Sequence, residues 1–181
     1  MINSKSGFPI LETERLLLRQ HRPSDTTAVF EMFADPEVTK HYLVHPFTEM
    51  EQAQKTTQSR IDRWYNGHGI RWAITLKDNE ELIGSCGYNK WHLPGEPIEI
   101  GYELKRPFWN QGIMTEAIKA CVDYGFNVRK MFAIEAWILP ENIGSARVLQ
   151  KVGFQSQGIK EAKGYFNGDF YDLEHYLIKK Q

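Results

Sequence analysis

The segment from Ile98 to Ala117 constrains the fold more than any other part of the sequence. Apolar residues alternate with polar residues or glycine from 98 to 104, which is the period of a β-strand. A short loop follows Pro107 and leads to Gly112, and apolar residues then recur every three or four positions, which predicts a helix at 115–128. The first backbone N–H groups of a helix lack partners within it, and the helix dipole favours negative charge there. The sequence therefore predicts an anion site at this turn, with a phosphate-bearing ligand as its natural occupant.

This turn lacks the two most familiar phosphate-binding motifs. The dinucleotide fingerprint requires G-x-G-x-x-G and the nucleoside triphosphate loop requires G-x-x-x-x-G-K-[ST], and the sequence contains neither here. Residues 109–114 read W-N-Q-G-I-M. They resemble the acyl-CoA pyrophosphate loop of the GCN5-related N-acetyltransferases, [QR]-x-x-G-x-[GA], from which Trp109 and Met114 depart. For this segment taken alone, a plain strand-to-helix turn is the alternative.

A second segment carries the same resemblance. Residues 140–154 read P-E-N-I-G-S-A-R-V-L-Q-K-V-G-F, which resembles the family's N-x-x-S-x-x-[VL]-x-x-K-x-G-F segment. Asn142 lies where a helix cap is expected, and Gly153 lies where a left-handed residue would end that helix. The alternatives are that Asn142 only caps the helix and that Ser145 is a surface hydroxyl. The two segments occur in order with an apolar strand between them, and the resemblance covers nearly the whole chain.

The hydrophobic pattern predicts the other elements. Strands are expected at 10–20, 70–76, 82–89, 98–104, 132–139, 154–159 and 170–178, helices at 26–34, 48–66, 115–128 and between 142 and 153, turns at 77–80, 93–97 and 167–168, and a break at 35–36. A chain of 181 residues suits one domain, 1–181, in which residues 1–9 form a loose arm. This order of elements predicts an α/β (α+β) sandwich around a mixed sheet.

The resemblance implies both a fold and an activity. The family has a mostly antiparallel sheet with helices on both faces, and its central strands splay apart to hold acyl-CoA. The branch resembled is the one that contains the ribosomal-protein N-terminal acetyltransferases. Its members move an acetyl group from acetyl-CoA to a primary amine, either a protein N-terminal α-amine or a small-molecule amine, by direct transfer through a tetrahedral intermediate. The alternative is a non-catalytic acyl-CoA-binding or sensing module with the same fold.

The resemblance also implies roles for individual residues. The backbone N–H at or near Leu104 is expected to face the thioester carbonyl. The family's strand glutamate falls on Glu99, which is the candidate general base, and Glu103 on the same strand face is its rival. For both, a solvated or salt-bridged carboxylate is the alternative. The residues expected to bind acyl-CoA are Leu104, Trp109, Asn110, Gln111, Gly112, Ile113, Met114, Thr115, Asn142 and Ser145.

The leaving thiolate needs a proton donor. Ser145 is the candidate, and Tyr165 or Tyr176 is the alternative. His41 and His45 are four residues apart, but no glutamate follows His41 directly and no third ligand is spaced for zinc, so no metal is expected. The loop at 38–46 and the first helices are where this family builds its acceptor pocket.

Composition limits the partners and the location. A net charge of −1 gives no overall electrostatic case for binding nucleic acid or an anionic membrane. No apolar run approaches the ~20 residues of a bilayer span, and the N-terminal residues lack the layout of a secretory signal. Cys86 and Cys121 resemble buried small hydrophobes rather than a disulfide framework. A cytoplasmic location is therefore expected, the family resemblance implies an amine acceptor, and a homodimer is left open.

Overall fold

The computed structural model describes residues 7–89 and 96–180. The strands are β1 (Leu11–Glu12), β2 (Leu16–Gln20), β3 (Ile70–Leu76), β4 (Asn79–Tyr88), β5 (Ile98–Leu104), β6 (Ala133–Ile138), β7 (Gln155–Phe166) and β8 (Asp169–Lys179). The α-helices are α1 (Thr26–Ala34), α2 (Pro36–Thr39), α3 (Met50–Tyr65), α4 (Ile113–Asp123) and α5 (Ile143–Val152). Short 3-10 turns lie at η1 (Pro23–Asp25) and η2 (Arg106–Phe108), and a π-helical turn, η3 (Tyr124–Val128), extends α4.

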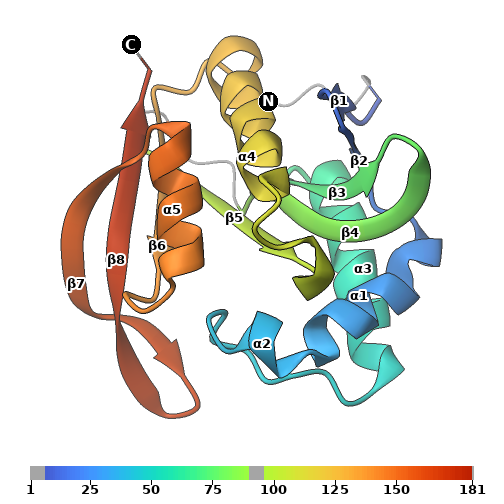
Figure 1. Ribbon diagram of the computed structural model, residues 1–181, viewed down its shortest axis with the longest axis horizontal. Helices are drawn as coiled ribbons and strands as arrows, with labels where there is room; N and C mark the ends of the chain where they lie inside the picture. Colours follow the sequence, from blue (N-terminus) through green and yellow to red (C-terminus); the bar gives the residue numbers. More distant parts are fainter. Residues whose placement is uncertain (1–6, 90–95, 181) are drawn as a thin grey trace.

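The described strands form one eight-stranded sheet in the order β1-β2-β3-β4-β5-β6-β8-β7. Neighbouring strands run antiparallel except for β5 and β6, which are parallel. Helices α4 and α5 lie on one face of the sheet, and α1 and α3 lie on the other (Figure 1). The predicted mixed, mostly antiparallel sheet with helices on both faces is confirmed.

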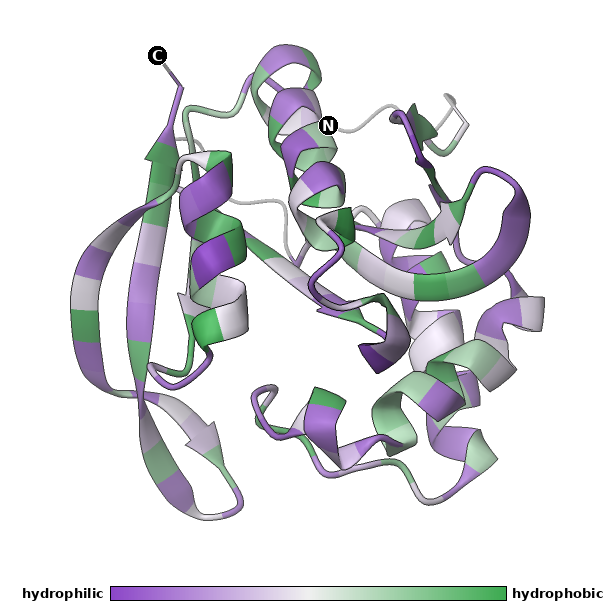
Figure 2. Cartoon of the chain, in the orientation of Figure 1, coloured by the Kyte–Doolittle hydropathy of each residue, from purple (hydrophilic) through white to green (hydrophobic). Residues whose placement is uncertain are grey.

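Each face of the sheet has its own core. The larger core lies under α4 and α5 and includes Ile98, Ile100 and Leu104 of β5, whereas the smaller core lies under α1 and α3. Because side chains alternate along a strand, Glu99 and Glu103 point to the face of α1 and α3. Figure 2 shows α4 and α5 in alternating hydrophobic and hydrophilic bands, as expected for helices with one buried side.

Strands β5 and β6 separate soon after they pair. Among the described residues, their register pairs are Ile98 with Ile134 and Glu99 with Glu135. Beyond these pairs the two strands run apart, while β5 stays paired with β4 as far as Leu104 (Figure 1). The predicted splay of the central strands is therefore confirmed, and it leaves one edge of β5 without a neighbouring strand.

The structure corrects one predicted strand and confirms one predicted break. The single strand expected at 10–20 is instead a hairpin: the chain reverses between Glu12 and Leu16, and β1 pairs antiparallel with β2. The break predicted at Asp35 and Pro36 is confirmed, because α1 ends at Ala34 and Asp35 is extended; the Asp35 carboxylate then accepts a hydrogen bond from the Glu37 N–H, and Pro36 begins the new helix α2. Proline suits this first helical position because its missing N–H would have no partner there.

Part of the segment expected to be a loose arm packs against the domain. Residues 1–6 lie outside the described residues, but the ring of Phe8 packs edge-on against Trp64 and Trp72, with ring centroids 5.6 and 6.2 Å away. The Trp72 indole also donates a 2.8 Å hydrogen bond to the Pro9 carbonyl. The turn expected at 93–97 falls mostly outside the described residues. Within 7–89 and 96–180, no helix is long and apolar enough to cross a membrane.

Candidate active site

The loop before α4 has the backbone conformation of a helix N-terminal anion site. Gly112 caps α4 with a φ of +76°, and Asn110 has a φ of +61°. A Cβ atom on Gly112 would meet only the Arg15 guanidinium at 3.6 Å, so the left-handed conformation rather than lack of space favours glycine here. The first N–H groups of α4 therefore face outward from a tight turn, as binding of a phosphate requires.

Arg15, which the sequence patterns did not single out, supports this loop. Its Nη1 donates to the Gln111 carbonyl at 3.1 Å, and its Nε donates to Glu116 of α4 at 2.7 Å. Glu116 also accepts a hydrogen bond from the Thr13 hydroxyl at 2.5 Å. Desolvation opposes ionisation of Glu116, but the bonds from Thr13 and Arg15 lower its pKa. These contacts join segments about a hundred residues apart, so no local pattern could reveal them.

Trp109 links the loop to the end of β5. Its indole Nε1 donates a 2.8 Å hydrogen bond to the Leu104 carbonyl, and its ring packs against both hydrophobic cores. Met114, the other departure from the family pattern, has a side chain that is almost fully buried in the larger core. Both departures therefore pack into the hydrophobic cores beside the loop.

Helix α5 begins beside the same loop. The Asn142 carboxamide oxygen accepts a hydrogen bond from the Ser145 N–H at 3.1 Å, and Gly153 ends the helix with a φ of +107°. Both helix-end predictions are confirmed. Capping does not take Asn142 away from the site, because Asn142 and Ser145 both line the cavity described next.

A cavity of about 360 Å³ opens beside β5, between α2, the loop before α4, and α5. Its walls include nine of the ten residues predicted to bind acyl-CoA; the exception is Gln111, whose side chain donates to the Pro107 carbonyl at 2.8 Å. The cavity is lined by Glu37, Val38, Lys40, His41, Tyr42, Tyr102, Glu103, Leu104, Phe108, Trp109, Asn110, Gly112, Ile113, Met114, Thr115, Asn142, Gly144, Ser145, Arg147, Val148 and Lys151.

The backbone of β5 turns N–H groups toward the gap left by β6. The Glu99 carbonyl accepts from the N–H of Asn89, just after β4, at 3.1 Å. The N–H of Lys105, just after β5, donates to the Ile83 carbonyl of β4 at 2.8 Å. The odd-numbered residues of β5 therefore use the β4 edge. In an antiparallel pair the bonding direction alternates along the strand, so the N–H groups of Tyr102 and Leu104 point to the opposite edge. That edge borders the cavity, which Tyr102 and Leu104 both line.

Glu103 reaches the cavity wall, but its carboxylate is fully engaged. It lies in ion pairs with Arg60 at 2.7 Å and with Arg71, and it accepts hydrogen bonds from Tyr42 at 2.9 Å and from Ser85. Burial by itself would raise the pKa of this carboxyl, but the two guanidinium groups and the two hydroxyls lower it below its ordinary value. A carboxylate held in this state is a poor proton acceptor.

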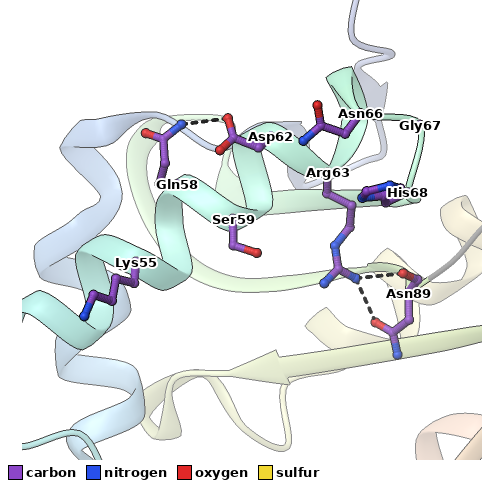
Figure 3. Close-up of a pocket in the computed structure, with 9 residues that line it drawn as sticks. All are labelled: Lys55, Gln58, Ser59, Asp62, Arg63, Asn66, Gly67, His68 and Asn89. Atoms are coloured by element: carbon purple, nitrogen blue, oxygen red, sulfur yellow. Dashed lines mark hydrogen bonds between the residues drawn. The ribbon is translucent and has the colours of Figure 1, made fainter.

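Glu99 lies on the same strand face but away from the cavity. Its carboxylate accepts a 2.5 Å hydrogen bond from the Asn89 amide, and Asn89 in turn accepts two from Arg63 of α3. Figure 3 shows Arg63 and Asn89 in an open groove of about 860 Å³ over α3, lined by Lys55, Gln58, Ser59, Asp62, Arg63, Asn66, Gly67, His68 and Asn89. Glu103 therefore lines the cavity beside β5, whereas Glu99 lines neither hollow and bonds to Asn89 at the edge of the groove.

Comparison with known proteins identifies the family. The acetyltransferase (GNAT) domain model matches residues 15–155 of the chain. The chain belongs to the GNAT acetyltransferase family. It is 38% identical over 173 residues to YoaA, an uncharacterized N-acetyltransferase of Bacillus subtilis (strain 168), with 96% of this chain and 98% of YoaA covered. Family membership makes the chain an acyltransferase of the N-acetyltransferase type.

Solved structures share the GNAT fold. A GNAT-family acetyltransferase from Bacillus anthracis superposes with a TM-score of 0.84 at 26% identity, covering 94% of this chain and 98% of that chain. RimL, a ribosomal L7/L12 α-N-protein acetyltransferase solved in complex with coenzyme A, superposes with a TM-score of 0.81 at 21% identity, again covering 94% and 98%. The GNAT fold predicted from the sequence is confirmed.

The hydroxyl groups in this GNAT protein differ in their access to the cavity. Ser145 lines it, whereas Tyr176 is buried beside Gln150 and Tyr165 is 65% exposed on the β7–β8 hairpin. Tyr102, which the sequence patterns had placed only as a strand residue, also lines the cavity and donates to the Ser145 carbonyl at 3.3 Å. Burial raises the pKa of Tyr102, which keeps its hydroxyl protonated.

Proposed function

We propose that this GNAT protein transfers the acetyl group of acetyl-CoA to a primary amine. One observation carries this proposal: a single cavity is lined by the N-terminus of α4, by Leu104 at the unpaired edge of β5, and by Ser145 of α5. These three features supply what acyl transfer from a thioester needs, namely an anion site, an N–H donor and a hydroxyl. The coenzyme A complex of RimL, which has the same fold, supports the choice of ligand.

Residues of the loop and of α5 hold acetyl-CoA in this proposal. The backbone N–H groups from Gly112 to Thr115 bind the pyrophosphate, and Trp109, Asn110 and Gln111 give the loop its shape. Arg147 and Lys151 line the same cavity from α5 and add positive charge for phosphate groups. Asn142 fixes the start of α5 and so the position of Ser145.

The reaction moves one proton from the amine and one proton to the thiolate. The Leu104 N–H stabilises the negative charge that develops on the carbonyl oxygen during attack by the amine. The tetrahedral intermediate then collapses with cleavage of the C–S bond, the Ser145 hydroxyl protonates the leaving thiolate, and Ser145 regains a proton from solvent water. The Glu99 carboxylate lies outside the cavity, where it bonds to Asn89. In this proposal it therefore takes the proton of the amine through water. The saturated carboxylate of Glu103 is not assigned this task.

A peptide α-amine is the favoured acceptor, and a small-molecule amine is the second. An α-amine has a pKa of about 7.7–8.0 and a lysine-type alkyl amine one of about 10.4, so only the α-amine is substantially deprotonated near neutral pH. This property matters here because Glu103, the carboxylate of β5 that lines the cavity, already pairs with two arginines. RimL, which shares the fold, is named for acting on the α-amine of a ribosomal protein.

Two measurements test this function. Calorimetry with CoA and with acetyl-CoA should show binding in the micromolar range, equivalent to about −8 kcal/mol. Release of free thiol, followed over peptides with free and blocked N-termini and over a set of alkyl amines, should identify the acceptor. A folded protein that binds neither ligand would refute the proposal. Binding with slow hydrolysis and no transfer to any amine would instead indicate an acyl-CoA-binding module.

A further inference from the structure

The Glu103 side chain is only 2% exposed although its residue forms part of the cavity wall. One carboxylate oxygen accepts from Arg60 and Ser85, and the other accepts from Arg71 and Tyr42. A carboxylate offers about four lone-pair sites, so these four donors saturate it. Glu103 therefore has no site left for an ammonium group or for the proton of an amine.

The four donors come from four separate parts of the chain. Arg60 belongs to α3, Arg71 to β3 and Ser85 to β4, and Tyr42 belongs to the segment that follows α2. The segment after α2 forms the cavity wall that faces β5, so Tyr42 joins that wall to the sheet. Glu103 is the point at which all four parts are bonded together.

Tyr42 is held from both ends. Its hydroxyl donates to Glu103 at 2.9 Å and accepts from Arg71 at 3.0 Å, and its ring packs edge-on against Phe33 with centroids 5.9 Å apart. The guanidinium of Arg60 lies 5.3 Å from the centroid of the same Phe33 ring. Arg60, Glu103, Tyr42 and Phe33 therefore form a closed ring of contacts, so displacement of any member disturbs its contacts with two others.

We infer that Tyr42 and Glu103 are positioning residues that fix the geometry of the acceptor side of the cavity. Leu104 directly follows Glu103 in β5, so the bonds that lock the Glu103 side chain also limit rotation of the Leu104 N–H. The same bonds hold the wall at 37–42 at a fixed separation from that N–H. This inference rests on the proposed transfer reaction, in which small displacements of reacting groups reduce the rate strongly.

Gly101 leaves room for the hydrogen-bond network around Glu103. A Cβ atom on Gly101 would lie 3.0 Å from Arg71 Nη1, which is closer than side chains normally pack. Gly101 lies between Glu99 and Glu103 on the same strand face, so its missing side chain leaves room for the Arg71 guanidinium. The substitution Gly101→Ala therefore displaces Arg71 without removing any hydrogen-bonding group of the network.

The main test is Tyr42→Phe, which keeps the ring and both buried ion pairs and removes one hydroxyl. We expect kcat to fall about tenfold, with the Kd for CoA and the KM for acetyl-CoA changed by less than about twofold. Gly101→Ala should act in the same direction. Tyr65→Phe is the matched control, because Tyr65 is 59% exposed on α3 outside the cavity, and it should leave kcat unchanged. An unchanged kcat in folded Tyr42→Phe would overturn the inference.

The pH dependence distinguishes positioning from proton transfer. In Glu103→Gln, kcat should fall at every pH while the pH–rate profile keeps its shape. If the acidic limb of the profile disappears instead, Glu103 is the general base and the inference is wrong. Should Glu103→Gln not fold, Tyr42→Phe carries the same comparison.

Hydrogen–deuterium exchange gives a readout that does not need turnover. In Tyr42→Phe, exchange at 37–47 and 102–108 should accelerate, while α4 and α5 keep their wild-type protection. Equal protection at 37–47 in both proteins would overturn the inference. Failure of the wild-type protein to bind CoA would refute the proposed function and leave this exchange result unaffected, so the two ideas can fail separately.

Discussion

The indole Nε1 of Trp109 donates a 2.8 Å hydrogen bond to the carbonyl oxygen of Leu104. This bond joins the loop that we assign to the pyrophosphate to the strand end that we assign to the thioester. The two ends of acetyl-CoA's binding region are therefore coupled through one side chain. The family pattern has glutamine or arginine at this position, and here tryptophan adds packing against both cores.

The substitution Trp109→Phe should weaken this coupling. Phenylalanine keeps an aromatic ring but cannot donate to the Leu104 carbonyl, so we expect the unfolding free energy to fall by about 1 kcal/mol. The value of kcat/KM for acetyl-CoA should fall about three- to tenfold, measured by thiol release. Trp137→Phe, on β6 outside the cavity, serves as the control. Equal effects of the two substitutions on kcat/KM would show that the Leu104 bond has no special role.

Gly112 can be tested with two side chains of equal size. Asparagine tolerates the left-handed conformation better than most residues, so Gly112→Asn should reduce affinity for CoA only moderately. Gly112→Asp adds a negative charge beside the proposed pyrophosphate and should weaken binding by at least a further tenfold, about 1.4 kcal/mol. Dephosphorylated pantetheine, which lacks that charge, should not distinguish Asn from Asp. If it does, the loop does not hold the pyrophosphate.

Ser145→Ala removes the proposed proton donor and leaves the helix cap intact, because Asn142 bonds the backbone N–H of residue 145. We expect kcat to fall ~10²-fold and the Kd for CoA to stay nearly constant, as for loss of a general acid. Ser156→Ala on exposed β7 is the control. A loss smaller than about threefold would transfer the role to another hydroxyl that lines the cavity, with Tyr102 as the first to test.

Glu99→Gln tests the proposed proton acceptor. Glutamine can still accept the hydrogen bond from Asn89, but it cannot take a proton, so the rate on a protonated amine should fall ~10²–10⁴-fold. Raising the pH should restore part of the rate, because more of the amine is then already deprotonated. Glu135→Gln is a close control, since Glu135 is the register partner of Glu99 on β6. If both variants keep wild-type rates, the amine loses its proton before it binds.

The buried Glu103 network should make the protein sensitive to acid. The folded pKa of Glu103 lies below its ordinary value, so the ionised carboxylate contributes stability above that ordinary value. This contribution is lost as the pH falls through the lowered, folded pKa. Glu103→Gln should cost about 3–5 kcal/mol at neutral pH and lose less additional stability in acid. Urea unfolding at pH 7 and in acid measures both, and an equal loss in acid for the two proteins would contradict this account.

Local sequence patterns determined many of the strand, turn and helix-end features of this protein. Alternation along 98–104, the glycine at 112 and the cap and stop of α5 are set by backbone conformation over a few residues, and the structure confirms each of them. The family resemblance carried by these segments implied ten acyl-CoA-binding residues, nine of which line one cavity. The strand period, the left-handed conformation at glycine and the helix caps could be predicted from the sequence because each depends on residues that are close together along the chain.

Tertiary structure decided which of the predicted groups can act. Glu99 and Glu103 are equivalent by strand period, yet one meets an amide and the other meets two buried arginines. The partners come from α3, β3 and the segment after α2, which only folding brings to β5. A carboxylate's proton affinity depends on the charges and burial within a few ångströms in space. The sequence alone cannot state those distances, because each joins residues far apart along the chain.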